Sequence, residues 1–169
     1  MIFFDTNEHQ IGEDRRFLLP PLGDQWKIFF DFKPTEYIQD ERLRTFVFLA
    51  LGHNDRRVTC LGLAIRGSSK IFLHCGIVHF GGVPVGEKEV AFESNELPVV
   101  GEWTRVEISH EREEDKYFLY LTVGGKELGQ KDVTSDQLRN APGTLLSIGR
   151  DDPGLIQTGF VRRVVALRK

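Results

Sequence analysis

The chain has 169 residues, of which 40% are hydrophobic and 28% are charged, a composition typical of a globular domain. Its formal net charge of −3 argues against a general binder of nucleic acids or other polyanions. No apolar run reaches the roughly 18 residues that a membrane-spanning helix needs, and the first residues lack the basic and long apolar regions of a signal peptide. We expect one domain, residues 1–169, taken from a longer chain, with no membrane insertion and no nucleic-acid partner.

Short β-strands are predicted along most of the chain. Aromatic and β-branched residues concentrate, in chain order, in segments 25–33, 45–51, 58–65, 70–80, 90–92, 103–110, 117–123, 145–148 and 160–167. Turns rich in Gly and Pro separate these segments, for example at 81–82, 124–125 and 153–154. Helical periodicity is nearly absent, and only residues 135–139 suit one short helical turn capped by Ser135. About a dozen short strands predict an all-β sandwich or barrel.

Two segments show which residues face the core. In segment 103–110, Val106 and Ile108 share one face, and Arg105 lies on the other. In segment 117–123, the residues on one face are Tyr117, Leu119, Leu121 and Val123. We therefore expect these apolar positions to pack inward.

The two cysteines lie on neighbouring predicted strands. Residues 66–69 suit a two-residue hairpin loop, because Gly67 tolerates the positive φ of a type II′ turn. With Arg66 opposite Ser69, Cys60 lies directly opposite Cys75. Two interpretations stay open: a pair of small buried apolar residues, or a cross-strand disulfide, which needs shorter Cβ separations than most directly opposed pairs have. Two cysteines are too few for a disulfide scaffold or a zinc site.

Several motifs occur in a fixed order from about Phe17 onward. They are FVFLALG at 46–52, VTCLGLAIRG at 58–67, GEWTRVEI at 101–108, LSIG at 146–149 and GFVRRVVAL at 159–167. Their order and spacing resemble those of laminin-G-like and thrombospondin-N-like domains, and segment 101–108 matches the pattern Gly-x-Trp-x-x-Val-x-Ile. The resemblance implies an antiparallel jelly-roll β-sandwich of the concanavalin A-like class.

Catalytic motifs are missing from the sequence. The glycosidases of this sandwich class carry a strand with alternating carboxylates, because acid and nucleophile must flank the sugar bond. The acidic run 111–115 is instead predicted to be a solvated hairpin loop. No Gly-x-Ser-x-Gly, His-x-x-x-His or Cys-x-x-Cys motif occurs, and the glycines at 81–86 lack the Lys of a phosphate loop. We therefore predict that the protein is not an enzyme.

Loop 52–57 (GHNDRR) is the most polar connection between predicted strands, and three interpretations stay open. The first is a plain hairpin loop, in which Asn54 and Asp55 support the turn. The second is a calcium site, which the resemblance to calcium-binding laminin-G domains implies, with Asp55 as one ligand and Asp151 or Asp152 as another. The third is a sugar site that uses His53, Asn54 and Arg57, although their spacing differs from the His-x-Asn-x-Arg strand of galectins.

Basic residues and Trp103 complete the candidate surface. The basic residues that the fold can group are Arg56, Arg57, Arg150, Arg162, Arg163, Arg168 and Lys169. Arginine suits sulfate and carboxylate through its planar fork, and the alternative is a solvated strand edge. Arg162 and Arg163 are expected on opposite faces, because they are adjacent in a strand. Trp103 is interpreted as a core residue or, alternatively, as a platform for sugar stacking.

The resemblance to laminin-G-like domains, together with the missing catalytic motifs, implies a non-catalytic extracellular recognition or adhesion module that binds a protein receptor or a glycan, including sulfated glycans. No cofactor is required, although calcium assistance is one interpretation. The predicted ligand-binding residues are His53, Asn54, Arg56, Arg57 and Arg150, with Asp55 and Asp151 as the metal ligands. Two alternatives stay open: a lectin-like domain attached to an enzyme, and a structural or oligomerisation domain without a small ligand.

Overall fold

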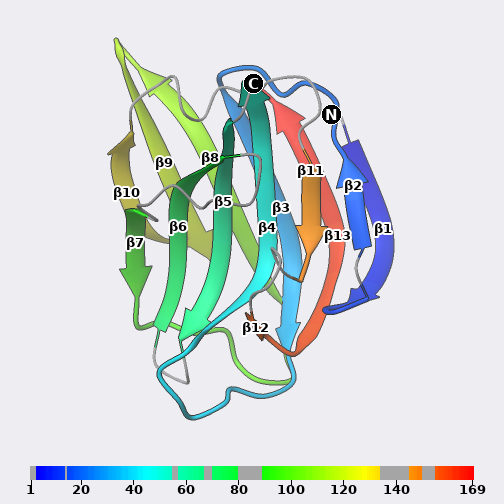
Figure 1. The fold of residues 1–169 in the computed structure, drawn as a ribbon. Coiled ribbons are helices and arrows are strands. Elements are labelled where there is room, and N and C mark those ends of the chain that lie inside the picture. The colour runs from blue at the N-terminus through cyan, green and yellow to red at the C-terminus, as the bar shows by residue number, and fades with distance from the viewer. Residues whose placement is uncertain are drawn as a thin grey trace.

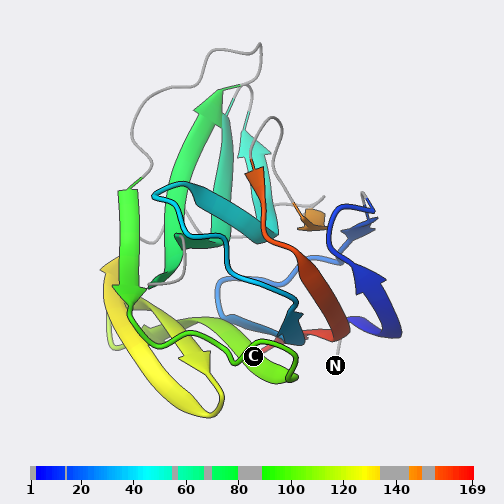
Figure 2. The same cartoon turned by 90° about the horizontal axis from the view of Figure 1, so that it is seen from below.

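The computed structural model describes residues 3–13, 15–54, 57–66, 70–79, 89–133, 145–149 and 155–169. The regular secondary structure of these residues is entirely β-strand, and no helix that could span a membrane occurs among them. Two sheets stack face to face (Figure 1; Figure 2, from below). The predicted antiparallel jelly-roll sandwich is therefore confirmed. The predicted turn at 135–139 lies outside the described residues.

Within the described ranges, thirteen strands build the two sheets. In chain order they are β1 (Phe3–Gln10), β2 (Arg15–Leu18), β3 (Trp26–Pro34), β4 (Leu43–Asn54), β5 (Arg57–Arg66), β6 (Lys70–His79), β7 (Glu89–Ser94), β8 (Thr104–Glu113), β9 (Lys116–Val123), β10 (Lys126–Val133), β11 (Leu145–Ile148), β12 (Leu155–Ile156) and β13 (Gly159–Arg168). The six-stranded sheet has the order β1-β13-β3-β8-β9-β10. The seven-stranded sheet has the order β2-β11-β4-β5-β6-β7, and the short β12 pairs with β4 in parallel.

Aromatic rings join the sheets at the centre of the core. Phe46 of β4 stacks on Phe32 of β3, with ring centres 4.4 Å apart, and meets Phe30 edge-on at 6.2 Å. All three side chains are at most 1% exposed. Burying an aromatic side chain stabilises the fold by about 1.5–3 kcal/mol, so this cluster fixes how β3 faces β4.

The alternation predicted for two segments is confirmed. Val106 and Ile108 of β8 are buried, whereas Arg105 is exposed on the opposite face. In β9 the buried residues are Tyr117, Leu119, Leu121 and Val123. Strand β3 alternates in the same way, because Trp26, Ile28, Phe30 and Phe32 fill the core. Asp31, between Phe30 and Phe32, and Lys33, after Phe32, therefore lie on the outer face of the six-stranded sheet.

The predicted register of the β5–β6 hairpin is wrong by one residue. Arg66 pairs with Lys70, so three residues separate the strands instead of the two of a type II′ turn. Cys60 consequently lies opposite Gly76, and Cys75 lies opposite Leu61. The cross-strand argument for a disulfide loses its basis, because it required direct opposition of the two cysteines. Their side chains lie outside the description.

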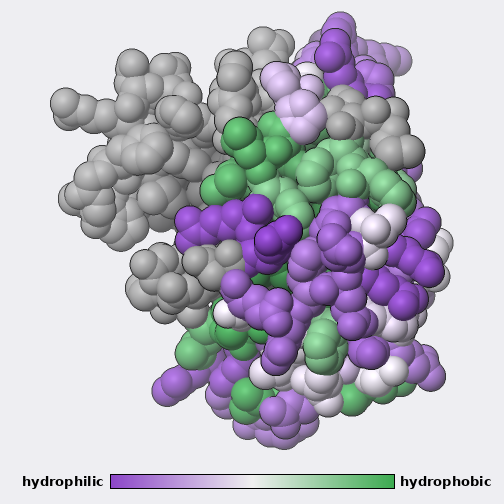
Figure 3. All heavy atoms as spheres, turned by 90° about the vertical axis from the view of Figure 1, so that its right-hand side faces the viewer, coloured by the Kyte–Doolittle hydropathy of each residue, from purple (hydrophilic) through white to green (hydrophobic). Residues whose placement is uncertain are grey.

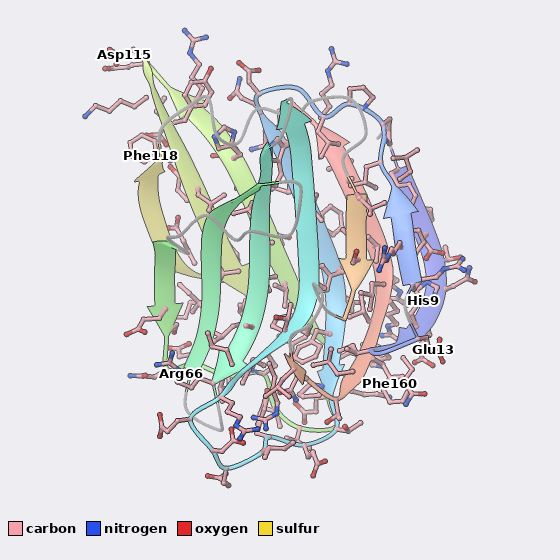
Figure 4. All side chains as sticks on the ribbon, in the orientation of Figure 1. His9, Glu13, Arg66, Asp115, Phe118 and Phe160 are labelled. Atoms are coloured by element: carbon pink, nitrogen blue, oxygen red, sulfur yellow. The ribbon has the colours of Figure 1, made fainter. Side chains whose placement is uncertain are left out.

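The acidic run 111–115 is a loop only in part. Strand β8 continues to Glu113, and Glu114 with Asp115 forms the turn to β9. Figure 4 shows Asp115 at the tip of this hairpin. Glu114 has a φ of 59°, which the tight turn imposes. Strand β8 is longer than predicted because Glu111 and Glu113 also pair with β9. Glu111 lies opposite Phe118, and Glu113 lies opposite Lys116.

An aromatic contact joins the sheets where β1 and β2 form their edges. Phe17 of β2 packs against Phe3 and His9 of β1, with ring centres 5.3 and 5.5 Å apart. The His9 Nε2 atom lies 2.6 Å from a carboxylate oxygen of Asp5, which holds the ring in place. Figure 3 shows this side of the molecule, where an apolar area is bordered by hydrophilic side chains.

Strands β1, β2, β10 and β12 were not among the predicted segments. Of these, β1 and β10 are polar edge strands. The sequence of β1 is FFDTNEHQ and that of β10 is KELGQKDV, and neither shows a regular apolar alternation. Each forms through main-chain pairing with a neighbour, β13 and β9 respectively. Periodicity detects a strand by its buried face, so it misses strands that backbone hydrogen bonds hold.

His110 is a fully buried titratable residue at the end of the core. Its ring stacks between Trp26 and Tyr117, with centres 5.9 and 5.1 Å away. The Nδ1 atom donates a hydrogen bond to the Asp24 carbonyl at 2.7 Å, and Nε2 has no partner among the described residues. Tyr117 donates its own hydroxyl to the Asp24 carboxylate at 2.9 Å. Burial lowers the pKa of His110, and the hydrogen bond to Asp24 and its charge oppose this shift only in part.

We expect His110 to make stability fall as the pH drops. The unfolded chain binds a proton at the ordinary histidine pKa of about 6.5, while the folded protein resists it, so stability is lost below that pH. One proton contributes at most about 1.4 kcal/mol per pH unit. Urea unfolding between about pH 7 and 5 will show a shallower loss in His110→Asn than in the parent. His9→Asn is the matched control and keeps the His110 contribution; equal slopes in the parent and in His110→Asn would contradict the assignment.

Candidate functional site

Of the sequence-predicted binding residues, the structure describes the backbone of His53, Asn54 and Arg57, in strands β4 and β5. The backbone of His53 and Asn54 ends β4, opposite Val58 and Arg57 of β5. The side chains of these predicted residues lie outside the description, and so do Asp55, Arg56, Arg150 and Asp151. The assignments of ligand and calcium to this loop therefore stay predictions.

A charged cluster occupies the outer face of the six-stranded sheet. Asp31 of the central strand β3 points away from the core, yet it is only 7% exposed. Three arginines cover its carboxylate. The nearest nitrogens are Nε of Arg105 at 3.6 Å, Nε of Arg162 at 3.4 Å and Nη1 of Arg163 at 3.6 Å. We call these four residues the Asp31 cluster.

A β-bulge brings Arg162 and Arg163 to the same carboxylate. Arg162 lies opposite Asp31 and Val165 lies opposite Phe29, so β13 contains one more residue than β3 between these pairs. Arg163 adopts a φ of 54° at this point. The expectation that the two arginines point to opposite faces is therefore wrong. Strict alternation holds only without bulges, and a bulge can redirect a side chain.

Trp103 lies beside this cluster and not in the core. Its side chain is half-buried, whereas Trp26 is the fully buried tryptophan. The centre of the Trp103 ring is 4.0 Å from the guanidinium carbon of Arg162 and 4.7 Å from Nζ of Lys33. The interpretation of Trp103 as a core residue is wrong, because its ring lies against Lys33 and Arg162 on the outer face of the sheet. The interpretation as a surface platform stays open.

Further aromatic rings lie beneath the cations. Arg105 covers Phe29 at 4.9 Å, and Lys33 lies 5.1 Å from the ring centre of Phe160. Figure 4 shows Phe160 near the start of β13, at the end of the sandwich opposite the Asp115 turn. Rings and cations attract through the ring quadrupole, so the cationic side chains are held close to these aromatic rings.

The comparisons with known proteins bear on the fold. No family model and no curated protein matches the chain. Among solved structures, the sialidase carbohydrate-binding module CBM40 of Ruminococcus gnavus, bound to α2,3-sialyllactose, has a TM-score of 0.63 at 12% identity, covering 99% of this chain and 92% of that one. The galectin LEC-6 of Caenorhabditis elegans has a TM-score of 0.57 at 10% identity, covering 95% of each chain. A pentraxin of Limulus polyphemus has a TM-score of 0.55 at 11% identity, covering 96% and 74%.

The chain shares a jelly-roll β-sandwich fold with these structures. At these identities the likeness shows the fold alone. The narrower resemblance to laminin-G domains rests on the sequence motifs only.

Asp31 is the site residue that sequence reasoning missed. It is a single carboxylate in the middle of the aromatic segment WKIFFDFK. Alternation with Phe30 and Phe32 already places it on the solvent face, so the signal was available. The proximity of Arg163 to Asp31 could not be predicted from alternation, because it depends on the bulge in β13. No group of three or more potential metal ligands occurs within the described ranges.

The bulge strains the backbone at Arg163, and the effect of this strain on stability can be tested. A non-glycine residue with positive φ costs roughly 1–2 kcal/mol, and the ion pair of Arg163 offsets little of this, because its side chain is 57% exposed. Arg163→Gly will therefore be at least as stable as the parent, whereas Arg163→Val will be destabilised by about 1 kcal/mol or more, since β-branched residues tolerate positive φ worst. Thermal and urea unfolding measure both. A glycine variant less stable than the valine variant would contradict the bulge geometry.

Proposed function

We propose that this protein is a non-catalytic extracellular recognition module that binds a glycan or a protein receptor through the outer face of the six-stranded sheet. The observation that carries the proposal is Trp103, which lies on this open face among cations instead of filling the core. Tryptophan and arginine are the residues most enriched at energetically important contacts. The flat face of an indole ring also packs well on the C–H face of a sugar.

The fold supports the same proposal by analogy. Two of the similar structures are a carbohydrate-binding module recorded with sialyllactose and a galectin. Because a fold hosts many functions, the argument rests on the residues of this chain. Trp103 with Phe29 and Phe160 provides the aromatic surface, and Lys33 with the arginines of the Asp31 cluster provides hydrogen-bond donors.

The carboxylates of β8 do not support a hydrolase function. Glu111 and Glu113 are two residues apart and share the outer face of the strand. Each already has its own partner: Glu111 accepts from Lys169, and Glu113 accepts the Tyr120 hydroxyl at 2.5 Å. This hydrogen bond raises the pKa of Tyr120 to about 12. In our proposal, Glu111 therefore forms a surface ion pair and Glu113 a surface hydrogen bond.

A glycan array followed by titration tests the proposal. Trp103→Ala should weaken binding to the best array ligand by at least about tenfold, which corresponds to 1.4 kcal/mol. Phe118→Ala is the matched control, because Phe118 is a half-buried aromatic residue on the outer face of the same sheet, near the opposite end (Figure 4). Equal losses in both variants would place the site elsewhere. An array without any bound glycan, together with no captured receptor, would overturn the proposal.

Calcium assistance through Asp55 and Asp151 is a separate part of the proposal, suggested by the laminin-G resemblance. A ligand that binds only the folded state raises the unfolding midpoint by mass action. We expect added calcium to raise the midpoint of the parent, chelator to reverse the shift, and Asp55→Ala to abolish it. Asp115→Ala, a change of another acidic residue in the β8–β9 turn, is the control. If added calcium leaves the unfolding midpoint of the parent unchanged, calcium binding is removed from the proposal.

A further inference from the structure

The arginines around Asp31 are paired unusually loosely. Of the three, only Arg162 comes within hydrogen-bond distance of the carboxylate, at 3.4 Å, and the other two stay at 3.6 Å. The same protein contains a well-formed pair for comparison. Arg44 donates two parallel hydrogen bonds to Asp40, at 2.6 and 2.7 Å. Such two-point pairing is the usual geometry of a structural arginine–carboxylate contact, and the Asp31 cluster lacks it.

The cluster also has more donors than its carboxylate can satisfy. A guanidinium carries five N–H donors, and a carboxylate offers about four acceptor sites. Asp31 is the only carboxylate that pairs with these three arginines among the described residues. Lys33 adds a fourth positive charge beside Trp103. Positive charge and open donors therefore remain available on this face.

The backbone holds the three arginines together despite their mutual repulsion. Arg162, Asp31 and Arg105 form one row across the adjacent strands β13, β3 and β8. Directly opposed residues have Cβ atoms about 4.5–5.5 Å apart, so the sheet fixes the spacing, and the bulge adds Arg163. Arg105 rests on Phe29 and Arg162 on Trp103. A ligand would meet donors that are already positioned, which reduces the entropy cost of binding.

The donors are accessible to a ligand. The side chains of Arg105 and Arg163 are 48% and 57% exposed, while Arg162 is 29% exposed. Arg163 also occupies a backbone conformation that glycine or asparagine adopts more easily. Strain of this kind often accompanies a functional site, and with arginine at position 163 instead of glycine a third guanidinium stays on the outer face.

We propose that Arg105, Arg162 and Arg163 bind one anionic group of a glycan, a carboxylate or a sulfate, while Trp103 contacts the sugar ring that carries it. This inference rests on the proposed function and names its ligand class. The incoming anion takes the free guanidinium donors, and Asp31 keeps the arginines in place while competing with the anion. Because Arg162 lies 4.0 Å from the Trp103 ring centre, both contacts are within reach of one acidic sugar residue.

The test uses oligosaccharides that share one backbone: carboxyl-reduced chondroitin, which is neutral, chondroitin, which carries carboxylates, and carboxyl-reduced chondroitin sulfate, which carries sulfates only. Calorimetric titration of the purified protein should show at least tenfold tighter binding of one or both charged forms than of the neutral form. Affinity should fall with added salt, as screening requires. The tighter of the two charged forms identifies which anion the arginines accept.

Variants separate ligand binding from a structural role. Arg163→Gly, which should keep the fold, and Arg105→Gln should each weaken binding of the charged form about tenfold. Asp31→Asn should strengthen it several-fold, because the competing carboxylate is gone, and an ion-pair network with only a structural role would show no such gain. Arg112→Gln is the control, since Arg112 lies on β8 but hydrogen-bonds to the Glu114 carbonyl.

Each failure points to a different conclusion. If charged and neutral forms bind equally, or if both arginine variants bind as the parent does while Trp103→Ala loses its ligand, the anion site is overturned and the recognition module stands. The same holds if none of the three oligosaccharides binds but a neutral array ligand does. If no glycan of any kind binds, the anion site falls together with the glycan function.

Discussion

The stacking of Phe46 against Phe32 is the contact on which the outer surface depends. It joins the two sheets at the centre of the core, with ring centres 4.4 Å apart, and fixes which residues of β3 face inward. A shift of one residue would bury Asp31 and Lys33 and expose Phe30 and Phe32, because strand residues alternate between faces. Core packing therefore determines, through the pleat of a single central strand, that one carboxylate stands in the middle of the outer face.

Sequence reasoning reached the fold class and the faces of β8 and β9, because both depend on burial, which apolar alternation records. It did not reach the polar edge strand β1, which main-chain pairing with β13 holds. Nor did it reach the β5–β6 register, where one additional loop residue moves Cys60 from Cys75 to Gly76. Loop length and backbone pairing leave little trace in side-chain chemistry, so a fold can be correct while its registers are not.

The sequence likewise predicted some features of the candidate site and not others. Asp31 and Arg105 follow from alternation, since Asp31 lies between buried Phe30 and Phe32, and Arg105 directly precedes buried Val106. Their pairing does not follow, because it requires that β3 and β8 be adjacent with Asp31 opposite Arg105. Trp103 was ambiguous for a related reason: an aromatic residue just before a strand has the composition of a core position and of a surface platform alike. Only the cations over its ring distinguish the two.

The bulge in β13 has a cause in the sequence itself. Val161 is buried, and strict alternation from it would place Arg163 and Val165 in the core. The additional residue instead returns Val164 and Ala166 to the core and leaves Arg163 on the outer face. An unpaired buried guanidinium would cost several kcal/mol, which exceeds the roughly 1–2 kcal/mol of a positive φ. Adjacent arginines between valines therefore favour the bulge, and the same distortion that protects the core gathers three guanidinium groups around Asp31.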